Sequence, residues 1–304
     1  MPDPAVRLSS IGHSWGGTAA LSGIDFEIDP GEIFGIVGPD GADKTTLMRI
    51  LAAVLRPSRG DAWISGRHTV RNPGGVHDIT GYVCQTTGLY PDLTVAENIR
   101  FASEIRGVPP SERRDRSARL LAATGLGEFT GRRAGALSGG MKQKLALVCS
   151  LLHTPEVLIL DEPTNGVDPL SRREFWRILS DLAGRGVTVV LATTYLDEAE
   201  RCDRSCLLSE GRAVDVGTPA AIREGSGLLV IEVTGSPDPA SLLTAFRRVP
   251  GLAVSLRAGC VRIAFRDPVG PERTLSEARR LAGPGCVVKQ SVPTLEDVLA
   301  AGAK

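Results

Sequence analysis

The sequence has few aromatic residues, no excess of charge of either sign, and no long apolar run. Lys and Arg together number 35, as do Asp and Glu, so no overall field draws the chain to nucleic acid or to anionic lipid. No run reaches the about 18 apolar residues of a membrane-spanning helix, and the first residues lack the apolar core of a secretory signal. These absences predict a cytoplasmic protein without a nucleic-acid partner, which reaches a membrane only through another subunit.

Aliphatic side chains and glycine are what the sequence does contain. Hydrophobic residues make up 42% of its 304 positions, with 35 glycines and 20 prolines, which suits a globular protein with a sizeable core. This length corresponds to about two domains. The six cysteines show no C-x-x-C spacing, so free thiols are expected rather than disulfides or a metal site.

The secondary-structure pattern changes once along the chain. Residues 1–225 alternate short apolar strands with amphipathic helices, and the continuous apolar runs at 157–161 and 186–192 are typical of parallel strands covered on both faces. Helical patterns at about 86–150 interrupt this alternation and predict a helical insertion. Residues 226–304 follow the order strand, helix, strand, strand, helix, strand, which predicts a small accessory α+β domain.

A glycine-rich loop, GPDGADKTT, joins a predicted strand to a predicted helix. In phosphate-binding loops of this kind, backbone N–H groups and the helix N-terminus hold the phosphates, a lysine reaches the β and γ phosphates, and a hydroxyl ligates Mg²⁺. Lys44 and Thr45 match the last two roles. The candidate phosphate-binding residues are Gly38, Pro39, Asp40, Gly41, Ala42, Asp43, Lys44, Thr45 and Thr46.

Asp43 stands where the usual pattern, GxxxxGK[ST], has its second glycine. A carboxylate about 5 Å from a phosphate charge costs about 3 kcal/mol at an effective dielectric near 20, which is roughly a hundredfold in affinity. Aspartate tolerates left-handed backbone angles, so the loop can keep its shape. If the side chain points to solvent, most of the penalty disappears.

Two acidic residues end the apolar strand at 157–161. Asp161 is placed to hold Mg²⁺ and Glu162 to polarise an attacking water, although a strand that ends in two acids is by itself most often structural. Before this strand, Ser138 opens an amphipathic helix within the sequence LSGG, where the simplest interpretation is an N-cap.

The order of these motifs resembles the nucleotide-binding subunit of ABC transporters over residues 5 to about 225, and most of all ABC-2 type exporter subunits and the first half of their tandem ATPases. GPDGADKTT resembles the Walker A loop, GYVCQ the Q-loop, LSGGMKQK the signature, VLILDE Walker B and GVDP the D-loop. PTLEDVL at 293–299 resembles a C-terminal motif of these ATPases. The resemblance implies a P-loop NTPase core of the ABC type with a helical subdomain.

The resemblance also implies ATP and Mg²⁺ as cofactors and roles for particular residues. Trp15 falls where the family places an aromatic ring that stacks on adenine, with ordinary packing as the alternative interpretation. The implied catalytic residues are Glu162, Gln85 and Thr194; the implied nucleotide contacts beyond the phosphate loop are Trp15, Ser138, Gly139, Gly140 and Asp168; the implied metal ligands are Thr45, Gln85 and Asp161.

Thr194 is a second departure from the family, which has a histidine there that senses the γ-phosphate. Threonine is shorter and uncharged, and the loss of one preorganised donor costs up to about 3 kcal/mol, or on the order of a hundredfold in rate. In the family two subunits pack head to tail, so that each ATP lies between the Walker motifs of one and the signature of the other. An intact signature beside the altered Asp43 and Thr194 predicts a weak site of its own and favours a heterodimer, with a homodimer as the alternative.

The function implied is that of an ATPase motor on the inner face of the cell membrane. ATP binding closes the dimer, hydrolysis opens it, and the insertion with the Gln85 loop passes the motion to a separate ABC-2 type permease. Two alternatives stay open. One is a regulatory module that binds ATP without hydrolysis; the other is a soluble ABC ATPase that acts on ribosomes or DNA, although the chain lacks the charged linker and long insertions of those proteins. The sequence does not identify the exported substrate.

Overall fold

The computed structural model describes residues 3–249, 251–266, 271–283 and 285–302. The chain divides into two compact units, Met1–Ala213 and Val214–Lys304. The division falls inside strand β10 (Arg212–Gly217), so residues 214–225 group with the second unit. Among the described residues, none of the helices combines the length and the apolar character needed to cross a membrane.

A six-stranded sheet with the strand order β10-β9-β3-β8-β7-β6 forms the centre of the first unit. Its remaining strands are β3 (Ile33–Val37), β6 (Thr80–Val83), β7 (Val157–Asp161), β8 (Thr188–Thr193) and β9 (Arg204–Ser209). Strands β6, β7, β8, β3 and β9 pair in parallel. Every residue of β3, β7 and β8 is buried, as the apolar runs in the sequence predict for parallel strands covered on both faces.

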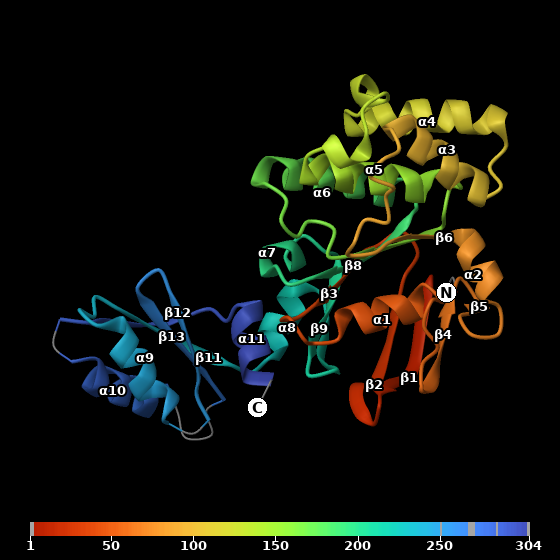
Figure 1. Ribbon diagram of the computed structural model, residues 1–304. Helices are drawn as coiled ribbons and strands as arrows, with labels where there is room; N and C mark the ends of the chain where they lie inside the picture. Colours follow the sequence, from red (N-terminus) through yellow and green to blue (C-terminus); the bar gives the residue numbers. More distant parts are fainter. Residues whose placement is uncertain (1–2, 250, 267–270, 284, 303–304) are drawn as a thin grey trace. The chain divides into compact units, whose positions relative to one another are not determined.

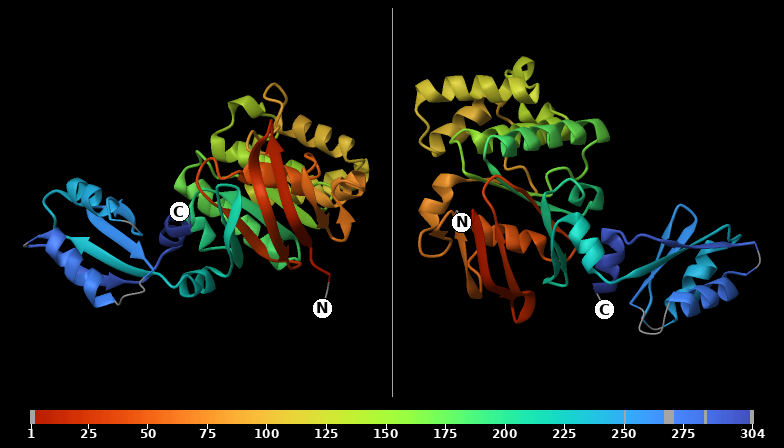
Figure 2. Two further views of the ribbon diagram at one scale, coloured as in Figure 1. Left: turned by 90° about the horizontal axis from the view of Figure 1, so that it is seen from below. Right: turned by 180° about the vertical axis from the view of Figure 1, so that it is seen from behind.

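A four-stranded sheet, β2-β1-β4-β5, forms a second layer of this unit, and Figure 2 shows its red strands β1 and β2 side by side. The strands are β1 (Val6–Trp15), β2 (Thr18–Ile28), β4 (Arg59–Ile64) and β5 (Arg67–His68). Helix α1 (Lys44–Leu51) contacts β7 and β8 of the central sheet as well as β2 and β4 of this one. The helix that follows the phosphate loop is therefore fixed between two sheets. Helix α2 (Pro73–Ile79) precedes β6.

The predicted helical insertion is confirmed by α3 (Val95–Ile105), α4 (Pro110–Thr124) and α5 (Gly139–Leu151), which Figure 1 shows gathered with α6 (Pro169–Gly184) on one side of the central sheet. A capping box of Thr94 and Glu97 starts α3. The insertion has its own apolar core, which includes Val95, Ile99, Val108, Leu126, Leu145 and Val148. Short 3-10 turns at Gly127–Phe129 and Ala134–Ala136 connect α4 to α5, and α7 (Leu196–Ala199) follows β8.

The second unit contains the predicted α+β domain. Its elements are α8 (Pro219–Gly225), β11 (Leu229–Thr234), α9 (Pro239–Arg247), β12 (Ala253–Arg257), β13 (Cys260–Phe265), α10 (Pro271–Ala282), β14 (Val287–Ser291) and α11 (Leu295–Gly302). The strands form an antiparallel sheet in the order β12-β13-β11-β14, and α9 and α10 pack against one face of it. On α11, the buried Asp297 accepts a 2.8 Å hydrogen bond from Arg262 of β13, so this last helix is tied to the sheet.

Candidate functional site

The phosphate loop occupies the turn between β3 and α1. A Cβ atom at Gly38 would lie 2.1 Å from the carbonyl oxygen of Leu208, so no side chain fits at the start of this turn. Gly41 has a φ of 80°, a left-handed conformation that favours glycine. The two glycines thus explain how the chain turns sharply from the buried strand into the helix.

Asp43 adopts the conformation expected of the glycine that it replaces. It is the N-cap of α1 and has a φ of 66° and a ψ of 27°, in the left-handed region. Its half-buried side chain accepts a 3.0 Å hydrogen bond from the hydroxyl of Thr46. The loop therefore keeps its shape without the glycine. The carboxylate is held in the first turn of the helix rather than extended into solvent. This first turn is where a bound phosphate is expected.

Lys44 and Glu162 form a buried ion pair beside this loop. The Lys44 Nζ atom lies 3.2 Å from Glu162 Oε1, and the two side chains are 4% and 7% exposed. The same ammonium group donates hydrogen bonds of 3.0 Å to the carbonyl oxygens of Gly38 and Pro39. The Lys44 ammonium group therefore lies at the loop, where the phosphates of a nucleotide can replace the carboxylate and the carbonyl oxygens as its hydrogen-bond acceptors.

Thr45 and Asp161 provide hard oxygen atoms of the kind that Mg²⁺ prefers. The Thr45 hydroxyl donates a 3.1 Å hydrogen bond to Asp161 Oδ1, while Asp161 Oδ2 is buried without a hydrogen-bond partner. Burial raises the pKa of Asp161, and a bound cation would favour the ionised form. The unpartnered oxygen fits a metal ligand. Gln85, the third predicted metal ligand, donates its side-chain amide to Glu162 Oε2 at 3.1 Å. The part of the chain that the structure describes holds no cluster of three or more His, Cys, Asp or Glu able to bind a metal.

Glu162 stands at the end of β7 in a left-handed conformation, with a φ of 50°. Such backbone strain in a residue other than glycine is typical of functional positions. Its Oε2 atom accepts hydrogen bonds from Gln85 at 3.1 Å and from Asn165 at 3.4 Å. Gln85 follows β6 and leads into the helical insertion. Its side-chain amide thus links the start of the insertion to Glu162, the candidate base. Asn165 was not among the residues predicted from the sequence.

Thr194 follows β8 directly and lies beside the phosphate loop, because the backbone N–H of Gly38 donates a 3.3 Å hydrogen bond to the carbonyl of Thr193. The side chain of Thr194 is half-buried. Its neighbour Thr193 donates a 2.6 Å hydrogen bond to Glu198, a fully buried carboxylate. Neither Thr193 nor Glu198 was among the residues predicted from the sequence; the acidic stretch YLDEAE at 195–200, which contains Glu198, directly follows the switch position.

Comparison with known proteins places this geometry in a family. The family model described as ABC transporter matches residues 21–165. The Nod factor export ATP-binding protein I of Paraburkholderia xenovorans (strain LB400) is 38% identical over 244 residues, which cover 80% of each chain. The chain belongs to the ABC transporter family.

Two further comparisons describe its relatives. The probable multidrug ABC transporter ATP-binding protein YbhF of Escherichia coli (strain K12) is 39% identical over 302 residues, 98% of this chain and 52% of that protein, so the chain spans about half the length of this relative. A dimeric ATP-binding cassette solved in a post-hydrolysis state with ADP and Pi bound matches with a TM-score of 0.64 and 26% identity over 70% of this chain and 98% of that chain. The predicted ABC-type core is thereby confirmed.

The predicted signature lies at the start of α5, with Ser138 as N-cap. Its hydroxyl accepts a 3.3 Å hydrogen bond from the backbone N–H of Met141. Ser138 and Gly139 are exposed, whereas Gly140 is buried where an added Cβ atom would lie 2.7 Å from Ser171 of α6. No hydrogen bond or ion pair among the described residues joins the signature to the Walker A loop of the same chain.

The predicted D-loop residue and the candidate adenine-stacking residue are both accessible. Asp168 is the exposed N-cap of α6, and its hydrogen bond from the backbone of Ser171, 3.0 Å long, lowers the pKa of its carboxyl. Trp15 ends β1 with 48% of its surface exposed and makes an edge-to-face contact of 4.5 Å with His13. The indole of Trp15 thus has an exposed surface that a base can cover.

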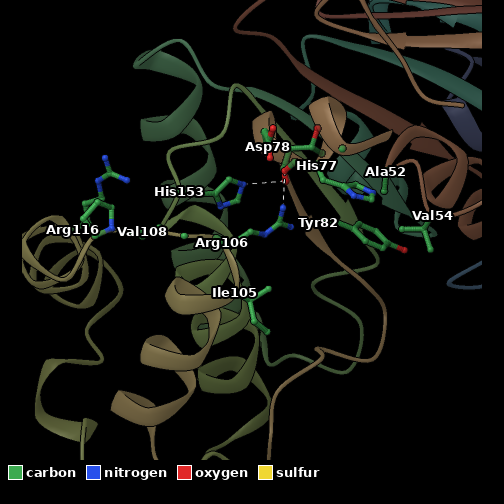
Figure 3. A pocket seen from close by; sticks show the side chains of 14 residues that line it. Ala52, Val54, His77, Asp78, Tyr82, Ile105, Arg106, Val108, Arg116 and His153 are labelled. Atoms are coloured by element: carbon green, nitrogen blue, oxygen red, sulfur yellow. Dashed lines mark hydrogen bonds between the residues drawn. The ribbon is translucent and has the colours of Figure 1, made fainter. Parts of the chain in front are cut away.

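A cavity of about 800 Å³ lies between α2, β6 and the helical insertion (Figure 3), and its lining includes none of the predicted Walker residues. Arg106 in its wall donates a 2.6 Å hydrogen bond to the carbonyl of His77, and Nε2 of His153 lies 3.1 Å from the carbonyl of Thr80. Burial lowers the pKa of both Arg106 and His153. Exposed Val54 and Ile105 add apolar surface to its rim. None of the residues that line it binds phosphate in the predicted scheme.

Proposed function

We propose that this chain is the ATP-binding and ATP-hydrolysing subunit of an ABC-2 type exporter and drives efflux through a separate permease at the inner face of the cell membrane. The observation that carries the proposal is the meeting of five side chains from three parts of the chain: the start of α1, the loop after β6 and the end of β7. Glu162 lies 3.2 Å from Lys44 and 3.1 Å from Gln85, and Thr45 lies 3.1 Å from Asp161. The names of the relatives, which refer to multidrug transport and to Nod factor export, support the class of exporters.

In the proposed reaction, Glu162 accepts a proton from a water molecule whose oxygen attacks the γ-phosphorus of ATP. The bond between that phosphorus and the bridging oxygen breaks, ADP retains the oxygen, and phosphate is released. Lys44 stabilises the charge on the transferred phosphoryl group, and Gln85 orients the water. Thr45 and Asp161 would hold Mg²⁺, which neutralises charge on the β and γ phosphates when bound.

Coupling to the permease runs through Gln85 in this proposal. The residue contacts the catalytic carboxylate at one end of its loop and leads into α3 at the other, so the presence of a γ-phosphate can be transmitted to the helical insertion. We place the permease contact at the cavity beside α2 and β6, because the exposed side chains of Val54 and Ile105 supply apolar surface there. The Gln85 loop and the cavity both adjoin β6.

A second ATP-binding subunit completes the proposed machine. The signature of this chain is intact and exposed at Ser138 and Gly139, which suits contact with ATP held by a partner. Its own site carries the carboxylate of Asp43 in the helix turn that faces the phosphates and the uncharged Thr194 at the switch position. We therefore propose that this chain contributes a weak site and completes a stronger one on a different subunit. The same two residues favour, as a second candidate function, a regulatory module that binds ATP without hydrolysing it.

Sedimentation velocity of the Glu162→Gln variant tests the arrangement. This variant lacks the base but retains the Mg·ATP ligands, so it should accumulate ATP-bound dimers if the chain pairs with itself, and Ser138→Arg in the same background should prevent them. If the chain remains monomeric but binds ATP, a different subunit is required. Absence of ATP binding in the wild-type chain would contradict both candidate functions.

A further inference from the structure

Glu198, on α7, is a fully buried carboxylate that lies outside the set of Walker, signature and switch residues. Its exposed fraction is 0%. Its Oε1 atom accepts hydrogen bonds from Thr164 Oγ1 at 2.6 Å and from Trp176 Nε1 at 3.2 Å, and its Oε2 atom accepts one from Thr193 Oγ1 at 2.6 Å. The Nε atom of Arg172 lies 3.7 Å from Oε1. One side chain thus joins three separate segments of the chain.

The first segment is the loop that carries the catalytic carboxylate. Thr164 follows Glu162 by two residues, and the backbone N–H of Asn165 donates a 3.2 Å hydrogen bond to the Glu162 carbonyl. Asn165 also donates through its side chain to Glu162 Oε2 at 3.4 Å. Fixing Thr164 therefore limits how far the candidate base can move relative to an attacking water.

The second segment is the end of β8, at the switch position. Thr193 donates to Glu198 and at the same time accepts a 3.0 Å hydrogen bond from the backbone N–H of Tyr195, so the hydroxyl closes the turn around Thr194. The carbonyl of Thr193 accepts from the N–H of Gly38 in the phosphate loop. Fixing Thr193 therefore sets the place of Thr194 relative to the γ-phosphate.

The third segment is α6, whose N-cap is the D-loop residue Asp168. Trp176 donates its indole N–H to Glu198, and the guanidinium of Arg172 lies 4.0 Å from the centre of the Tyr195 ring. Arg172 brings positive charge near the buried carboxylate. Three donors and a nearby cation make Glu198 a costly group to remove, because each donor would be left without this acceptor in a buried region.

We infer that Glu198 is a positioning residue for ATP hydrolysis, which holds the Glu162 loop, the switch position and the D-loop helix in one fixed arrangement. It does not touch the nucleotide; it acts through Thr164 and Thr193. The inference rests on the proposed hydrolysis. Since binding of ATP depends mainly on the phosphate loop and hydrolysis on the placement of Glu162 and Thr194, disturbing Glu198 should lower the rate of the chemical step much more than the affinity for ATP.

Two variants test the inference, with a matched control on the same strand. Glu198→Gln keeps the shape but loses the charge and one acceptor, and Thr193→Val removes the hydroxyl that donates to Glu198 and accepts from the N–H of Tyr195. Thr188→Val is the control, because Thr188 is also buried in β8 but its hydroxyl accepts a 2.9 Å hydrogen bond from the N–H of Gly31, at the other end of the strand. Thr188→Val loses this one buried hydrogen bond and should lower stability somewhat less than Thr193→Val, which loses two.

The readouts are single-turnover hydrolysis of Mg·ATP, the Kd for ATP, and backbone hydrogen exchange. We expect the hydrolysis rate constant to fall at least about tenfold in Glu198→Gln and Thr193→Val, with Kd within about threefold of the wild type, because a misplaced reacting group loses rate before affinity. The amides of Asn165 and Tyr195 should exchange faster in Glu198→Gln. Thr188→Val should leave the rate, the affinity and these two amides unchanged.

If the hydrolysis rate constants of Glu198→Gln and Thr193→Val equal that of Thr188→Val, the inference is overturned, whether or not the amides exchange faster. A loss of rate with unchanged exchange at Asn165 and Tyr195 would overturn it as well, since positioning would then not be the cause. If the wild-type chain hydrolyses no ATP, the proposed function fails separately. The exchange experiment then decides alone, and unchanged protection at both amides in Glu198→Gln rejects the positioning role.

Discussion

Replacing Asp43 with glycine should raise the affinity of the chain for ATP. The carboxylate of Asp43 is held by Thr46 in the first turn of α1, and this helix N-terminus is the expected location of the phosphates. Glycine removes the charge and accepts the observed φ of 66° without strain. The loop therefore retains its conformation, and the change in affinity measures the electrostatic effect of the carboxylate.

The expected gain follows from the charge and its partial exposure. At about 5 Å and an effective dielectric of about 20, one charge pair is worth about 3 kcal/mol. Asp43 is only half-buried, so salt and water screen part of this repulsion. We expect ATP to bind about tenfold to a hundredfold more tightly, which corresponds to about 1.4 to 3 kcal/mol. Loss of the hydrogen bond from Thr46 offsets little of this, since it contributes about 1 kcal/mol to stability and not to ATP binding.

Isothermal titration calorimetry with Mg·ATP on the wild type, Asp43→Gly and Asp43→Asn measures the effect. Asparagine keeps the acceptor for Thr46 and tolerates left-handed angles, so it isolates the charge from the backbone. Both variants should gain affinity to a similar degree, and the gain should shrink as salt concentration rises. ATP affinities within about twofold of the wild type in both variants at low salt would refute the reasoning, since about 0.4 kcal/mol leaves no room for the repulsion.

Three further predictions concern other parts of the chain. Gly140→Ala places a Cβ atom 2.7 Å from Ser171 of α6 and should lower the free energy of unfolding, measured in urea, by about 1–3 kcal/mol. Gly139→Ala is the control, because its Cβ atom would lie 3.8 Å from the nearest atom and should not lower stability. Equal stabilities of the two variants would contradict the close packing at Gly140. Trp15→Ala should weaken ATP binding by about 1–3 kcal/mol and leave tripolyphosphate binding unchanged, because only ATP has a base that can stack on the indole. An equal loss of affinity for both ligands would argue against stacking. Glu232 accepts a hydrogen bond from Lys289, and this bond is the main reason why the pKa of Glu232 lies below its ordinary value of 4.5. Because the folded pKa is the lower one, this stabilisation is present above the unfolded pKa of about 4.5 and is lost as pH falls through the folded pKa, so the second unit should lose stability as pH falls below about 4.5. Glu232→Gln should flatten that slope in unfolding experiments, and an unchanged slope would exclude this carboxyl as its source.

The central strands and the phosphate loop were predictable because their signals are local. The apolar run that ends at Asp161 forms a strand buried on both faces, and the loop from Gly38 to Lys44 has the residues that a strand-to-helix turn around a phosphate requires. The left-handed conformation of Asp43 was also within reach, since aspartate is one of the few residues that tolerate it.

The contacts within the site were not predictable in the same way, because they join residues far apart in the sequence. Nothing local indicates that Lys44 pairs with Glu162, or that Glu198 accepts a hydrogen bond from Trp176. The direction of the Asp43 side chain was left open, since its hydroxyl partner Thr46 depends on how the first helical turn is built. Sequence motifs identify the chemistry, and the fold decides which groups share a hydrogen bond.

Hydrolysis of Mg·ATP by the purified wild-type chain, beside Glu162→Gln and Lys44→Ala, tests the central claim most directly. We expect slow but measurable turnover by the wild type, none by either variant, and ATP binding that survives in Glu162→Gln and is lost in Lys44→Ala, because the carboxylate activates water whereas the ammonium holds phosphate. Equal turnover in the wild type and Glu162→Gln would contradict the assignment of the base and, with it, the proposed motor.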